Sequence, residues 1–229
     1  MNEMKELHFS HGEREIVARV FSPKTPGTVL YVHAEEDAAS LWQAVRPTGA
    51  ALVCISGEDW NRDLSPWPAE KVFRQGEAFT GNAPEYLKFW QNTLLPAAED
   101  ALGFTPNFRG IAGYSLAGLF ALHAAAETGL FHGAASVSGS LWFDGWLEHF
   151  RREPLPPALK RVYLSVGSTE KNARNPRMAT VEDCTRAAAE HLRQHGKAVR
   201  FELNPGGHFN DPAARLQKGV LSLLSPASP

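Results

Sequence analysis

The sequence predicts a doubly wound α/β fold: one mostly parallel, eight-stranded sheet with helices on both faces and an antiparallel hairpin at its edge. Residues 5–22 form two alternating apolar and polar runs around the turn His11-Gly12-Glu13, as in a hairpin. After the hairpin, short continuous apolar runs alternate with helical patterns, which is typical of strands buried on both faces. Because these elements use nearly all of the 229 residues, we expect a single domain over 1–224, no cap domain, and a frayed tail at 225–229.

Two hydrophobic periods define the individual elements. Apolar runs of strand length, rich in β-branched residues, lie at 28–32, 51–55, 108–112, 133–137, 161–166 and 198–203. Helical spacing of apolar residues is found at 38–46, 84–102, 115–129 and 178–195. Segment 57–83 fits neither period. Since structureless connections of this length are uncommon inside a compact domain, we expect this segment to have a functional role.

The charge and composition exclude several classes of protein. The 23 Lys and Arg residues nearly balance the 25 Asp and Glu residues, for a formal net charge of −2. A nucleic-acid or anionic-membrane binder needs a basic face, so we expect neither partner. The longest uncharged stretch, 110–126, contains Gly, Ser and His and is shorter than the ~20 apolar residues of a membrane span.

Targeting and cysteine patterns add further expectations. Residues 1–6 alternate in charge and lack the apolar core of a secretory signal, so we expect a cytoplasmic protein. Cys54 lies in an apolar run and is interpreted as a buried, inert thiol, and with Cys184 it fits no metal spacing. We therefore expect neither a metal nor a cofactor.

The strongest functional signal is a serine between a predicted strand and a predicted helix. The run 108–112 leads into Gly113 and Ser115, and the helical pattern begins at once. This order is typical of the nucleophile elbow of α/β-hydrolases, in which a sharp turn lifts the serine hydroxyl above the sheet. The N–H of Leu116 would then point at the oxyanion, beside the positive end of the helix dipole. Because Ala117 replaces the second elbow glycine, an alternative is that Ser115 only caps a helix.

The triad of an α/β-hydrolase follows the chain order serine, acid, histidine. Among nine histidines, His208 alone lies in a Gly-rich turn just after the last predicted strand, from which it could act as general base. The acid should follow the strand 161–166, which favours Glu170. Asp183, Asp144 and a Ser–His dyad remain open alternatives.

These residues suggest hydrolysis of a small carboxylic ester through an acyl-enzyme. The second oxyanion donor should come from the loop after 28–32, around Ala34 or Glu35. That loop lacks the Gly-rich run of lipases, so long-chain lipid substrates are not favoured. An acyltransferase, a peptidase or amidase, and a non-catalytic binding module remain alternatives.

Four side chains are candidates for the substrate pocket, and three of them lie on segment 57–83. The candidates are Trp60, Arg62, Trp67 and Trp142. The aromatic faces would suit a flat acyl group, and the guanidinium would suit a polar or anionic one. In the alternative interpretation, Arg62 pairs with Asp63 and fixes the loop.

Several segments, in their order along the chain, resemble one known family. They are Asn61–Pro66, Tyr86–Phe89, Leu94–Pro96, Gly113–Leu122 and Ala134–Phe143. The sequence resembles, over about 28–210, the "Putative esterase" family of α/β-hydrolases, which includes enterochelin (siderophore) esterases and esterase D-type enzymes. The resemblance implies that Ser115 and His208 are nucleophile and base, with Glu170 as the acid. Ala117 and Gly139 depart from the family pattern, which often has glycine and proline at these positions.

Overall fold

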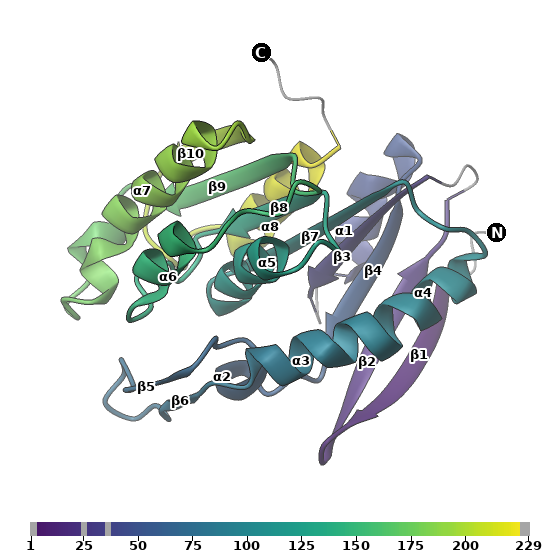
Figure 1. Cartoon of the computed structure of the whole chain (residues 1–229), viewed down its shortest axis with the longest axis horizontal. Helices are drawn as coiled ribbons and strands as arrows, with labels where there is room; N and C mark the ends of the chain where they lie inside the picture. Colours follow the sequence, from purple (N-terminus) through teal and green to yellow (C-terminus); the bar gives the residue numbers. More distant parts are fainter. Residues whose placement is uncertain (1–3, 24–26, 35–37, 225–229) are drawn as a thin grey trace.

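The computed structural model describes residues 4–23, 27–34 and 38–224 and confirms the predicted fold class (Figure 1). One sheet contains eight strands in the order β1-β2-β4-β3-β7-β8-β9-β10. Their bounds are β1 (Met4–His11), β2 (Arg14–Phe21), β3 (Thr28–His33), β4 (Ala51–Ser56), β7 (Phe108–Tyr114), β8 (Gly133–Val137), β9 (Arg161–Gly167) and β10 (Ala198–Asn204). The β1–β2 and β2–β4 pairs are antiparallel, and all other neighbours are parallel. The carboxyl ends of the parallel strands therefore meet at one edge, where α/β folds place their sites.

Helices cover both faces of the sheet, as the sequence predicts. One face packs on α1 (Ala38–Val45) and α8 (Pro212–Ser222). The other packs on α3 (Ala83–Phe89), α4 (Leu95–Leu102), α5 (Leu116–Glu127), α6 (Trp146–Arg152) and α7 (Val181–Gln194), seen in front of the sheet in Figure 1. Short 3₁₀ turns lie at Arg46–Thr48, Glu170–Asn172 and Met178–Thr180. Among the described residues, no helix has the length and apolar character needed to cross a membrane.

Helix α5 lies at the centre of the larger core. It is apolar on every side, and ten consecutive residues after its first, 117–126, are buried. Such a helix is stable only when protein surrounds it, which explains its position over β7 and β8. The Phe120 ring shows this packing: its centroid lies 5.2 Å from that of His33 and 5.4 Å from that of Tyr86.

Segment 57–83 contains ordered elements that the sequence pattern did not predict. These are α2 (Trp60–Asp63) and a two-stranded sheet of β5 (Pro68–Ala69) and β6 (Phe79–Thr80). The Asp63 side chain, 1 % exposed, organises the segment: its Oδ2 accepts from the Asp59 N–H at 2.9 Å and its Oδ1 accepts from Asn82 at 3.4 Å. Arg62 Nε lies 3.9 Å from Asp63 Oδ1, in agreement with the pairing considered from the sequence.

Other differences from the sequence prediction concern helices. The pattern at 84–102 forms α3 and α4 with a π-helical turn, Trp90–Leu94, between them. Pro96 explains the interruption, because proline donates no backbone hydrogen bond and its ring crowds the preceding turn. Helices α6 and α8 were not predicted. Cys54 is buried, as expected, and the predicted tail at 225–229 lies outside the described residues.

Two phenylalanines provide a test of this core. Phe120 is 0 % exposed and Phe73 is 58 % exposed. We expect Phe120→Ala to lower the free energy of unfolding by about 3–5 kcal/mol, because it opens a cavity under α5. Phe73→Ala is the matched control and should change it by less than about 0.5 kcal/mol. Urea denaturation followed by circular dichroism measures both; equal effects would show that α5 does not form the core.

Candidate active site

Ser115 lies at a sharp turn between β7 and α5. Its backbone has φ 58° and ψ −122°, a conformation that L-residues rarely adopt. The turn is held from both sides, since the Ser115 N–H donates to Val137 O at 3.0 Å and the Leu119 N–H donates to Ser115 O at 3.1 Å. A Cβ at Gly113 would lie 2.2 Å from Ala117 O, so only glycine fits there. The local geometry is that of the predicted nucleophile elbow, with Ala117 accommodated.

His208 faces this serine from the loop that follows β10. Its Nε2 lies 3.0 Å from Ser115 Oγ, and its Nδ1 lies 2.8 Å from Glu170 Oε2. The Tyr114 hydroxyl donates to His208 O at 2.5 Å, which fixes the backbone of the loop. The structure thus brings together the three residues that the sequence selected, in a continuous chain of hydrogen bonds.

Glu170 follows β9 in a 3₁₀ turn and is 7 % exposed. The Gly167 N–H donates to its Oε1 at 2.7 Å, so both carboxylate oxygens are hydrogen-bonded. Burial raises the pKa of Glu170, but the hydrogen bonds from His208 and Gly167 outweigh it and hold the pKa below its ordinary value of 4.5. The two other acids considered lie elsewhere: Asp144 pairs with Arg177 at 2.7 Å, and Asp183 is exposed on α7.

Arg215, which sequence reasoning missed, lies behind these residues and is 5 % exposed. Its guanidinium donates to Gly207 O at 3.0 Å and to Pro205 O at 2.5 Å, and lies 3.6 Å from Glu170 Oε1. The side chain therefore ties the loop that carries His208 to the turn that carries Glu170. The sequence could have indicated that Arg215 holds this loop only if 212–222 had been predicted as a helix. Arg215 then lies on the buried side of that helix, beside Leu216.

The two predicted oxyanion donors differ. Leu116 is the first residue of α5, so its N–H has no partner within the helix and lies next to Ser115. The Ala34 N–H donates instead to Ile55 O at 3.0 Å. The prediction for Ala34 is therefore wrong, because the β3–β4 pairing continues one residue further than the apolar run and uses this N–H. Glu35, the other residue considered, lies outside the described residues.

A pocket of about 250 Å³ opens beside Ser115 and His208. Segment 57–83 contributes one wall and the chain after β8 and β9 the other. Besides Ser115, Leu116, Glu170 and His208, it is lined by Trp60, Asn61, Val72, Phe73, Gly76, Glu77, Phe79, Ser140, Trp142, Ala173, Met178, Val181 and Phe209. Most of these side chains are apolar, and among the described residues that line the pocket there is no lysine or arginine. Of the four candidate pocket residues, Trp60 and Trp142 line this pocket. The sequence did not indicate the other lining residues outside the Ser115 site, because their places depend on the turns of the loops.

The other two predicted pocket residues lie elsewhere. The Trp67 ring packs on His123, Phe143 and His149, with centroid distances of 6.3, 6.1 and 5.3 Å, and its N–H donates to Asp144 O at 2.8 Å. Its role is to fix segment 57–83 to the protein. Arg62 does not line the pocket, and its guanidinium lies next to Gly12 in the hairpin turn. Both predictions rested on residue type, which does not show the direction of a side chain on a loop.

Comparisons with known proteins agree with this geometry. The model of the family described as "Putative esterase" matches residues 32–211. The uncharacterized protein YbbA of Bacillus subtilis is 28 % identical over 199 residues, which are 85 % of this chain and 75 % of that protein. The siderophore hydrolase EstA from Aspergillus nidulans superposes with a TM-score of 0.73 at 18 % identity, covering 97 % of this chain and 94 % of EstA. The enterobactin and salmochelin hydrolase IroE superposes with a TM-score of 0.74 at 17 % identity, covering 98 % of this chain and 96 % of IroE. At these identities the two structures establish a shared fold.

The lowered pKa of Glu170 makes stability depend on pH. A carboxyl whose folded-state pKa is lowered stabilises the fold above its unfolded pKa, and this contribution is lost as the pH falls below 4.5 towards the folded pKa. We expect Glu170→Gln to be less stable than wild type at pH 7 and to lose less stability on acidification. Urea denaturation at pH 7 and at lower pH measures how the free energy of unfolding changes with pH in wild type and in Glu170→Gln. Asp183→Asn, on the exposed surface, is the control. If the stability of Glu170→Gln depended on pH as strongly as that of wild type, Glu170 would not be the cause of the dependence.

Proposed function

The chain belongs to the "Putative esterase" family, and from this premise we propose that it is a serine hydrolase that cleaves a carboxylic ester through an acyl-enzyme. The observation that carries the proposal is the hydrogen-bonded chain from Ser115 through His208 to Glu170 at the mouth of a pocket. A residue that only caps a helix needs neither a histidine at its hydroxyl nor a buried acid behind that histidine. The arrangement therefore supports turnover over a non-catalytic binding module.

The reaction follows from the positions of these groups. Ser115 Oγ attacks the ester carbonyl carbon while its proton passes to His208 Nε2. The oxyanion that forms would accept from the Leu116 N–H, at the positive end of α5. When the tetrahedral intermediate collapses, the C–O bond to the alcohol breaks and the alcohol takes the proton from His208. A water molecule then gives a proton to His208 and attacks the acyl carbon. The bond between that carbon and Ser115 Oγ breaks, Ser115 Oγ takes the proton back from His208, and the acid leaves.

Glu170 would keep the imidazole in the required tautomer. Its carboxylate accepts from Nδ1, so that Nε2 is left with a lone pair for the serine proton. The same carboxylate would stabilise the imidazolium that forms during the attack. The lowered pKa supports this role, because the acid is ionised throughout the neutral range.

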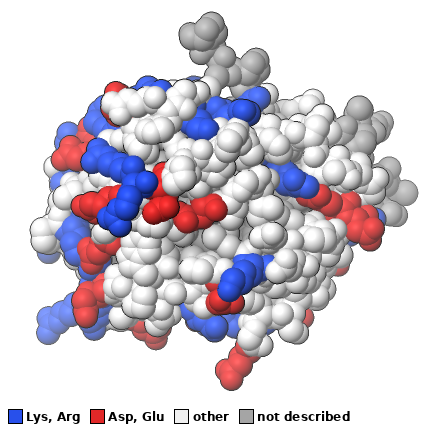
Figure 2. Space-filling model, in the orientation of Figure 1, with Lys and Arg blue, Asp and Glu red and all other residues white. Residues whose placement is uncertain are grey.

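The pocket favours an uncharged substrate with an apolar or aromatic group. Its walls are mainly aromatic and aliphatic, its acidic side chains are Glu77 and Glu170, and the described lining residues include no lysine or arginine. An anionic group would be desolvated there without a partner. Figure 2 shows acidic and basic side chains interspersed around a mainly uncharged surface, which fits a small molecule better than a polyanion.

Replacement of the nucleophile is the first test. We expect Ser115→Ala to lower kcat/KM for p-nitrophenyl acetate and butyrate by roughly 10⁴–10⁶-fold, since only binding and the oxyanion donors remain. A fluorophosphonate probe should label wild type and not the variant. Ser10→Ala, on the exposed hairpin, is the control. A Ser115→Ala variant with most of its activity would refute the proposal, and acyl transfer to an added alcohol in preference to water would identify an acyltransferase.

The charge preference has its own test. Pairs of esters that differ by one carboxylate, such as p-nitrophenyl butyrate and hemisuccinate, should differ in kcat/KM by tenfold or more in favour of the neutral ester, which corresponds to about 1.4 kcal/mol. Phe73→Lys should reduce this ratio about fivefold, because it adds a cation at the pocket rim. Phe73→Met, which removes the ring without adding charge, should keep the wild-type ratio. Equal rates for both esters in wild type would contradict the preference.

A further inference from the structure

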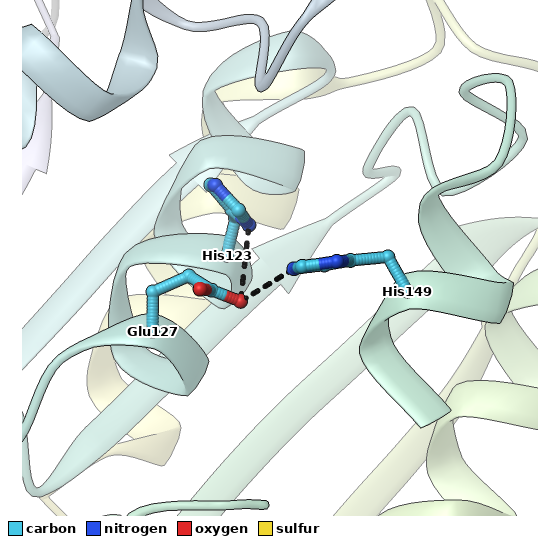
Figure 3. A group of neighbouring side chains, drawn as sticks. All are labelled: His123, Glu127 and His149. Carbon is cyan, nitrogen blue, oxygen red and sulfur yellow. Dashed lines mark hydrogen bonds and ion pairs between the residues drawn. The ribbon is translucent and has the colours of Figure 1, made fainter. Parts of the chain in front are cut away.

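Two histidines and a glutamate converge on the side of α5 that faces α6, away from the triad. His123 and Glu127 lie one turn apart on α5, and His149 comes from α6 (Figure 3). Figure 3 shows both imidazoles directed at the same carboxylate oxygen. None of these residues lines the pocket beside Ser115, and the proposed reaction uses none of them.

The distances suit the ligand atoms of one metal ion. His149 Nε2 lies 2.8 Å and His123 Nδ1 lies 3.9 Å from Glu127 Oε1, and one ligand atom from each residue lies within 4.8 Å of the other two. Around a tetrahedral zinc ion, with bonds of about 2.0–2.2 Å, ligand atoms are separated by about 3.3 Å. The two measured distances bracket this value.

The surroundings resemble a built site more than a chance surface ion pair. The His123 side chain is 6 % exposed, so it is held within the packing of α5 rather than free in solvent. The Trp67 ring meets both imidazoles edge to face and covers them. Glu127 and His149 are 30 % and 29 % exposed, which leaves room for a water ligand.

We propose that His123, Glu127 and His149 bind a divalent transition-metal ion of the zinc type, with water as the fourth ligand. Two imidazoles and one carboxylate suit zinc and its neighbours better than magnesium or calcium, which prefer oxygen ligands only. The ion would join α5 to α6 and so fix the chain that carries Trp142 into the pocket. The sequence prediction of no metal looked for cysteine spacing and could not pair α5 with α6.

The test uses untagged full-length protein freed of metal with a chelator. Calorimetric titration with ZnCl₂ should show one site per chain. Zinc at about 100 times its Kd should raise Tm by roughly 5–10 °C, because the ion binds only the folded state. His149→Ala and Glu127→Gln should each weaken binding about tenfold or more. These two side chains are partly exposed, so both variants should fold.

His195→Ala is the matched control, because His191 on α7 and His195 at its C-terminal cap form another histidine pair, with ring centroids 4.3 Å apart. It should leave zinc affinity unchanged. Three results would overturn the proposal: no zinc binding by wild type, unchanged binding in both His149→Ala and Glu127→Gln, or loss of binding in His195→Ala alone. In the second case the cluster is an ion pair only. None of these measurements depends on esterase activity.

Discussion

The close approach of α5 to β7 and β8 is the constraint on which the site depends. A Cβ at Gly118 would lie 3.0 Å from Gly139 Cα, and a Cβ at Gly139 would lie 2.0 Å from Ser136 Oγ. Together with Gly113, these positions let the helix begin directly on the sheet. That packing holds Ser115 in a backbone conformation that costs of order 1–3 kcal/mol in an unconstrained chain. The serine is therefore presented by the rigid core rather than by a flexible loop.

Glu170 completes this arrangement from the other end of the site. Its carboxylate receives hydrogen bonds from Gly167 and His208, and Arg215 from α8 lies against it. A buried carboxylate is stable only when both oxygens have partners, so the turn after β9, the loop after β10 and α8 must form together. His208 is thus positioned by the turn after β9, the loop after β10 and α8, and contacts with Glu170 hold these three parts together.

Sequence reasoning succeeded where residue identity and local pattern determine the structure. Ser115 and Glu170 follow predicted strands and His208 lies in a Gly-rich turn, and parallel strands bring all three to one edge of the sheet. It failed where the result depends on which way a side chain or an N–H points. Trp67 and Arg62 pack elsewhere than in the pocket, and the Ala34 N–H donates to Ile55 O in the sheet. On a strand or helix the periodicity of the sequence predicts which way a side chain points. A loop has no such period, so the direction of Trp67 or Arg62 could not be predicted.

The residues around Ser115 and the residues of the pocket wall come from different kinds of structure. Ser115, Glu170 and His208 follow strands of the sheet, and this chain shares its fold with EstA and IroE at only 17–18 % identity. One wall of the pocket comes from segment 57–83, where buried Asp63 and the Trp67 anchor fix a short helix and a two-stranded sheet. Polar contacts within the segment and the packing of Trp67 on α5 and α6 both hold this wall in place. Because the described residues that line the pocket include no lysine or arginine, an anionic group placed there would lose its hydration without gaining a cationic partner from either side chain.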